Sequence, residues 1–312
     1  MKLRSLGSTL PTAALFGKLP CALDFVRANH DSLESIALDR WLQAALQRLT
    51  ARQRSWPSGQ LVFTFALDAE HSLVGVATGS RDRAGRSFPV AVYARVPRPP
   101  QVACGAAALV LASEPFVAGA RALLEHSAEL QPTEVPLRLR RLRVPRAQDV
   151  LAAAEELAVN LAGSDLSAFG GRLFGAAPAR ERSALSAFEQ LRRRRSNTGT
   201  AVECFDCPVK GLRDVAIWAY WLERAHGRPS AALWDLPGHE RALLAVGPLP
   251  ERAPLFWALP TTSHPQLCRI GDGAGVGAVD RAGDGAGVAP DASGGEQCLA
   301  AVFERLVRDA PG

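Results

Sequence analysis

The stretch between residues 31 and 97 constrains the fold most strongly, because a helical period is followed there by three apolar runs with short connections. Asp31 is predicted to cap a helix, and Glu34 three positions later completes a capping box. A short strand at Ala13–Gly17 is expected to precede this helix. Six residues at helical spacing predict its apolar face: Leu38, Trp41, Leu42, Ala45, Leu46 and Leu49.

The three runs after this helix have the composition of strands. Leu61–Leu67, Leu73–Thr78 and Phe88–Val96 are short, apolar and rich in β-branched or aromatic residues. The last two are separated by Arg81–Arg86, whose aspartate and glycine suit a tight polar turn. Because short connections join antiparallel strands, the order of elements indicates a strand, a helix and an antiparallel meander.

Signals further along the chain predict a second unit. Pro132 and Pro136 mark a boundary, and Leu137–Val144, where arginines alternate with apolar residues, is predicted to be an edge strand protected by charge. The expected segments are a first domain at 1–132, a second α/β domain at 133–268, a glycine-rich flexible linker at 269–295 and a terminal helix at 296–312. The further elements expected are helices at Val102–Ala112, Phe116–Leu130, Ala147–Leu161, Ser183–Leu191, Leu212–Ala225 and Cys298–Val307, and strands at Thr200–Phe205, Ala231–Trp234 and Ala242–Val246.

These elements indicate an α/β fold in the α+β sense. We expect an antiparallel sheet of profilin- or longin-like character that is backed by helices, together with a second, smaller α/β unit. Gly227 is predicted to end the helix at Leu212–Ala225. The sequence Gly-Asp-Gly-Ala-Gly-Val occurs at 271–276 and again at 283–288, but no strand precedes it and no Lys-Ser/Thr pair follows. A linker therefore fits this segment better than a nucleotide loop or a calcium-binding repeat.

Composition points to a soluble cytoplasmic protein. The net charge is only +5, and no apolar run approaches the roughly 20 residues that span a bilayer. Six cysteines in 312 residues are too few for a disulfide framework. Because no apolar run is long enough to span a bilayer, we expect no membrane insertion. Aromatic residues do not interleave with the arginines, so no nucleic acid is expected as a partner either.

Candidate chemistry is sparse. Cys204 and Cys207 form a CxxC, but without a second pair for zinc or a helix N-terminus for redox work they are predicted to be buried structural thiols. No nucleophile–base pattern is present, so the prediction is no catalytic residues, no metal and no cofactor. The arginine clusters at 138–143 and 192–195 allow a phosphate-binding surface, although an edge strand and a helix end explain them more simply.

Three ordered motifs carry a family resemblance. Leu15–Pro20 reads Leu-Phe-Gly-Lys-Leu-Pro and is followed by Asp-Phe-Val at 24–26. Asp39–Leu42 reads Asp-Arg-Trp-Leu, and Asp82–Pro89 reads Asp-Arg-Ala-Gly-Arg-Ser-Phe-Pro. Over about Ala13–Pro97 the chain thus resembles the TagF (ImpM) family of type VI secretion proteins. The resemblance implies a cytoplasmic, non-enzymatic repressor that contacts the forkhead-associated scaffold protein or another secretion subunit. A structural binding module without repression and a hydrolase-type enzyme are the alternatives.

Five charged residues of these motifs form the candidate site. If the loop after the first strand and the turn at 81–86 lie at one end of the sheet, they meet in one cluster. Arg83 and Arg86 have no evident local role, so at least one is expected to reach Asp24 or a partner protein. The cluster is either an internal brace or a docking surface, and both readings stay open. Its predicted members are Lys18, Asp24, Asp82, Arg83 and Arg86.

Overall fold

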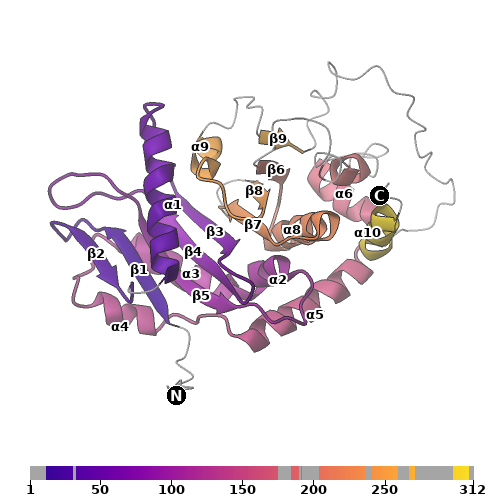
Figure 1. The fold of residues 1–312 in the computed structure, drawn as a ribbon, viewed down its shortest axis with the longest axis horizontal. Helices are drawn as coiled ribbons and strands as arrows, with labels where there is room; N and C mark the ends of the chain where they lie inside the picture. The colour runs from indigo at the N-terminus through magenta and orange to yellow at the C-terminus, as the bar shows by residue number, and fades with distance from the viewer. Residues whose placement is uncertain are drawn as a thin grey trace, which may run out of the picture.

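The structure is a computed structural model that describes residues 12–30, 33–174, 184–189, 191, 204–235, 240–258, 267–270 and 298–308. The described strands are β1 (Ala13–Lys18), β2 (Phe25–Ala28), β3 (Gln60–Ala66), β4 (His71–Thr78), β5 (Val90–Pro97), β6 (Cys204–Pro208), β7 (Ser230–Trp234), β8 (Arg241–Val246) and β9 (Leu267–Arg269). They form one sheet in the order β2-β1-β5-β4-β3-β7-β8-β6-β9 (Figure 1). All neighbours pair antiparallel except β6 and β9, which are parallel.

Helices cover both faces of this sheet. They are α1 (Leu33–Thr50), α2 (Gly105–Ala112), α3 (Glu114–Glu125), α4 (Val135–Arg140), α5 (Ala147–Gly163), α6 (Leu166–Phe174), α8 (Leu212–His226), α9 (Ala253–Ala258) and α10 (Leu299–Arg308). Apolar residues of α1 and α9 pack on one face. Those of α2, α3, α5, α8 and α10 pack on the other. The expected α/β fold with an antiparallel sheet backed by helices is confirmed.

Alternation along the strands produces the two cores. In β3, Phe63 belongs to the core under α1 and Val62 to the core under α2 and α8. Successive side chains of a strand point to opposite faces, so a strand covered on both sides must be apolar throughout. This requirement explains why the predicted strands read as continuous apolar runs. The predicted meander is confirmed as β3-β4-β5, and β1 adds to it beside β5.

One strand pair joins the two halves of the chain. In β3, Val62 lies opposite Trp234 of β7, and Thr64 lies opposite Ala232. Strands on either side of the predicted boundary near residue 132 therefore share one sheet. The division into domains itself stays a prediction.

The apolar face predicted for α1 is confirmed. Leu38, Leu42, Ala45 and Leu49 have no exposed surface, and Trp41 keeps 6% of its own. The predicted cap cannot be compared with the structure, because Asp31 lies outside the described residues and so does the side chain of its partner in the capping box.

The edge strand predicted at Leu137–Val144 is wrong. This stretch begins within the helix α4 and continues as a turn. The buried residues of α4 are Val135 and Leu139, four positions apart, whereas Leu137 is 56% exposed. The pattern of burial is thus helical, and Pro136 stands near the helix start, where a missing N–H costs nothing.

Most other elements of the second half were predicted correctly. The helices α5, α8 and α10 and the strands β7 and β8 lie where the sequence places them. Gly227 ends α8 with a φ of 60°, in the left-handed region that favours glycine. Strand β6 spans Cys204–Pro208 and so runs past the predicted end at Phe205, while 200–203 lie outside the described residues. The predicted linker at 269–295 also lies outside the described residues, apart from its first two residues.

Among the described residues, no single helix is long and apolar enough to cross a membrane. The helices α2 and α3 reach the necessary length and composition only as a pair, and they are bent by 55° at the break between them.

Candidate functional site

A buried ion pair joins two of the three motifs. Lys18 is the last residue of β1, and Asp82 lies in the turn between β4 and β5. The Lys18 Nζ lies 2.8 Å from the Asp82 Oδ2. The two residues expose only 6% and 4% of their surface. A buried charge is tolerated only when it is paired and hydrogen-bonded, so each of these residues requires the other.

The Asp82 carboxylate also organises its own turn. Its Oδ1 accepts the backbone N–H groups of Ala84 at 3.0 Å and Arg86 at 2.9 Å, and its Oδ2 accepts the Arg86 Nε at 2.7 Å. Gly85 has a φ of 80°, which a residue with a side chain rarely adopts. The spacing Asp-x-x-Gly-Arg therefore meets a local requirement of the turn, and Arg86 closes it.

These contacts change the proton affinity of Asp82. Burial by itself would raise the pKa of the carboxyl group, but the hydrogen bonds from Lys18 and Arg86 outweigh this effect and lower the pKa from 3.8 to about 2. The group is therefore ionised throughout the physiological range, and both of its oxygens already accept hydrogen bonds.

The same motifs meet at Gly17 and in a group of aromatic rings. A Cβ at Gly17 would lie 2.3 Å from the Pro89 carbonyl oxygen, so only glycine lets β1 approach β5 at this point. Phe25 stacks on Phe16 with ring centres 5.4 Å apart, and it meets Phe88 edge to face at 4.8 Å. Gly17, Phe16 and Phe25 thus each pack against a residue of the 82–89 motif.

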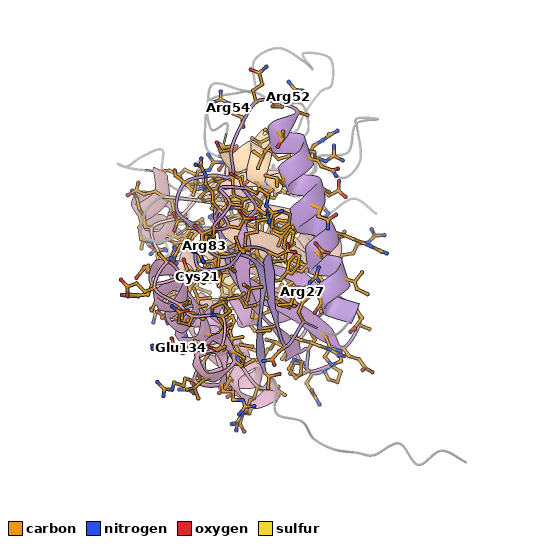
Figure 2. All side chains as sticks on the ribbon, turned by 90° about the vertical axis from the view of Figure 1, so that its left-hand side faces the viewer. Cys21, Arg27, Arg52, Arg54, Arg83 and Glu134 are labelled. Atoms are coloured by element: carbon orange, nitrogen blue, oxygen red, sulfur yellow. The ribbon has the colours of Figure 1, made fainter. Side chains whose placement is uncertain are left out.

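The two loops are tied together by their backbones. The Arg83 N–H donates to the Ala22 carbonyl oxygen at 2.8 Å, and the Arg86 guanidinium donates to that of Leu23. Leu23 is 64% exposed, and Asp24 and Arg83 are exposed as well. Figure 2 shows Arg83 beside Cys21 on one side of the molecule. We call Leu23, Asp24 and Arg83 the loop surface.

The five predicted residues thus come together but do different things. Lys18, Asp82 and Arg86 form an internal brace, in which Arg86 reaches Asp82 rather than Asp24. Asp24 accepts the N–H of Phe25 at 2.8 Å and otherwise faces outward, as Arg83 does. Sequence reasoning missed Leu23, because the loop at 19–24 is largely apolar and only the exposure of this side chain sets it apart. The docking role predicted for these residues stays a prediction.

The brace leads to a prediction for acid stability. Asp82→Asn keeps an oxygen for the turn amides but loses the charge. Because the folded pKa of Asp82, about 2, lies below its ordinary 3.8, the carboxylate contributes stability above pH 3.8 that is lost as the pH falls through 2. Denaturant midpoints of the wild type and the variant should therefore converge over this range. Asp24→Asn, an exposed control, should show no such convergence. A difference in denaturant midpoint between the wild type and Asp82→Asn that stays constant with pH would contradict the role given to the Asp82 carboxylate.

The CxxC cysteines lie on opposite faces of β6. Cys204 belongs to the core under α1 and α9, whereas Cys207 belongs to the core under α8. Both are at most 1% exposed. Residues three apart in a strand point away from each other, so the two thiols cannot form one disulfide or bind one metal ion without breaking the strand. The structural interpretation of these thiols fits this geometry.

A second buried carboxylate joins residues from the two halves of the chain by hydrogen bonds. Glu223 of α8 accepts the N–H groups of Ala106 and Ala107 at 3.3 Å each, and that of Ser230 at 3.2 Å. It thereby satisfies two donors at the start of α2 and one at the start of β7. Burial raises the pKa of Glu223 from 4.5 to about 7, although the three donors favour the carboxylate.

Comparison with known proteins agrees with the motifs. Residues 14–142 match a family model of type VI secretion system-associated proteins. That family is the TagF N-terminal domain, and the resemblance is confirmed over these residues. The chain is also similar to the crystal structure of PA0076 from Pseudomonas aeruginosa PAO1, with 17% identity and a TM-score of 0.46 over 81% of this chain and 96% of that one. No curated protein matches the chain.

Proposed function

We propose that this type VI secretion-associated protein is a cytoplasmic regulator that represses assembly of the apparatus by binding another of its proteins. The partner that we propose is the forkhead-associated scaffold protein, and the binding site is the loop surface. The observation that carries the proposal is the division of the motifs into a brace, built on the buried pair Lys18–Asp82, and an exposed rim. Lys18, Asp82 and Arg86 hold the two loops, and Leu23 and Arg83 are left outward.

The exposed rim has the chemistry of a protein-binding site. Arginine is enriched among the residues that dominate binding energy, and it acts best beside an apolar contact that excludes water. Leu23 supplies an exposed apolar side chain, and the Arg83 backbone is fixed to the neighbouring loop by the bond to Ala22. Fixed loops lose little conformational entropy on association, so the side chains on them contribute more of their contact energy to affinity.

The brace supports binding rather than catalysis. A general base at neutral pH works best with a pKa near 7, whereas that of Asp82 is about 2. Its oxygens accept bonds from Lys18, Arg86 and two turn amides, which leaves the carboxylate committed to the fold. A hydrolase-type activity would therefore have to use other residues.

Arg83→Ala tests the docking role. Exposed arginines contribute little to folding, about 0–1 kcal/mol, so the melting temperature should stay nearly unchanged. Loss of an interface arginine costs about 2 kcal/mol, which is roughly a thirtyfold loss of affinity for the scaffold protein. The measurement is co-purification and titration with the scaffold protein, and Arg54→Ala is the matched control, exposed at the end of the molecule away from Arg83 (Figure 2).

Secretion by cells that carry Arg83→Ala separates repression from a structural role. Release of a repressor should increase secretion, whereas loss of a structural module should reduce it. Full binding together with unchanged secretion would place the docking surface elsewhere on the protein and refute the proposal.

A further inference from the structure

A second surface, far from the loop surface in the sequence, carries a concentration of positive charge. Five arginines occur within the nine residues from 138 to 146. They lie on the last turn of α4, on the connection that follows and at the start of α5. Arg138, Arg140 and Arg141 are exposed, and their side chains form no ion pair with any described residue. This charge is therefore available to a ligand.

The surface around these arginines contains two hollows. A groove of about 630 Å³ lies between α4, the connection to α5 and the first residues of β1. Arg140, Arg143 and Arg146 line it, and Leu139, Leu142 and Val144 supply its apolar part. On the other side of α4, a smaller hollow of about 400 Å³ is lined by Arg138 and Arg141.

The negative charge within the groove is already engaged. Asp149 is the only carboxylate among its described lining residues. Its Oδ2 accepts the N–H of Arg146 at 2.8 Å, at the start of α5, and its Oδ1 lies 3.6 Å from the Arg143 guanidinium. This carboxylate stabilises the N-terminus of α5, where negative charge is favourable. Three arginines against one such carboxylate leave the groove net positive.

We propose that this groove binds an acidic segment of a partner protein. Carboxylates of the segment pair with Arg140 and Arg143, since arginine offers a planar fork that matches a carboxylate. Apolar side chains between those carboxylates contact the partly buried Leu142, which lines the groove. This inference does not depend on the loop surface, because no residue is shared between the two.

The lining favours a peptide over other anions. A groove of this volume far exceeds a single phosphate group, and its apolar part would have no role there. Its described lining contains no aromatic side chain on which bases could stack. The residues that precede Thr12 carry Lys2 and Arg4 and no acid, so like charge opposes their use as the occupant.

The test uses the full chain and a short fluorescein-labelled peptide in which glutamate and leucine alternate, followed by fluorescence anisotropy. Arg140→Ala with Arg143→Ala should weaken binding about tenfold, because two charge-assisted contacts are lost. Raising the salt should reduce the difference, since exposed charges are screened. Arg52→Ala with Arg54→Ala changes the net charge equally and should alter affinity less than about twofold. Figure 2 shows these two arginines well away from Glu134, which precedes α4.

Several outcomes would overturn the proposal. Equal weakening by both double variants would indicate general charge attraction. Oligothymidylate bound as tightly as the peptide, with the same dependence on Arg140 and Arg143, would indicate a nucleic-acid site, and stronger binding to phosphatidylserine vesicles would indicate a membrane surface. Absence of peptide binding at about 1 mM would also refute it. Circular dichroism checks folding, and Arg140→Ala alone carries the test should the double variant unfold.

Discussion

Trp41→Ala is expected to lower the free energy of unfolding by about 3–5 kcal/mol, the usual effect of removing a large buried aromatic side chain. Trp41 contacts the rings of Trp56 and Phe63, with centres 6.2 Å and 5.5 Å apart. Its Nε1 donates to the Pro250 carbonyl oxygen at 3.2 Å, which ties α1 to the segment before α9. The substitution therefore leaves a cavity and removes this tie between α1 and the segment before α9. Chemical denaturation followed by circular dichroism measures the loss.

Ile36→Ala on the same helix is the matched control. Ile36 is 49% exposed, so its removal should cost well under about 1 kcal/mol. Similar losses for both variants would mean that α1 does not pack through the face described above.

Glu223→Ala is expected to cost roughly 3 kcal/mol or more, because three buried N–H donors lose their acceptor at once. The substitution affects the starts of both α2 and β7, so the whole sheet should lose stability together. Thermal unfolding of the variant beside Glu125→Ala, an exposed glutamate on α3, provides the measurement.

The pH dependence identifies the carboxyl group responsible. The folded pKa of about 7 lies above the ordinary 4.5, so the folded protein holds the proton longer than the unfolded chain. The stability that Glu223 contributes is therefore full below pH 4.5 and is lost as the pH rises through 7. The difference in the free energy of unfolding between the wild type and Glu223→Ala should therefore decrease as the pH rises from 4.5 to 7. A gap that widens with pH would contradict this account.

Local periodicity predicted those elements that bury one clear face. The spacing from Leu38 to Leu49 specified α1 because every fourth position had to meet the sheet. The same reasoning failed at α4, where arginines stand at alternate positions and imitate a strand with one charged face. Only two residues of α4 are buried, Val135 and Leu139, and so short a helix leaves almost no periodic signal.

The candidate site was predicted in its membership but not in its geometry. The motifs identified Lys18, Asp82 and Arg86, yet 64 positions separate the first two, and no local pattern encodes which carboxylate a lysine will meet. The assignment of Arg86 to a structural contact required the turn, whose shape depends on Gly85 and on two backbone amides. Leu23 stood out only once its exposure was known.

The pairing of β3 with β7 gives the family match a limit. The TagF N-terminal domain model ends at residue 142, yet the edge of β3 is completed by residues 232–234, and α2 packs against α8. A chain cut after 142 would present an open strand edge and an apolar helix face to solvent, the features that promote self-association. The segment that the family model recognises is thus smaller than the segment that can bury its own surface.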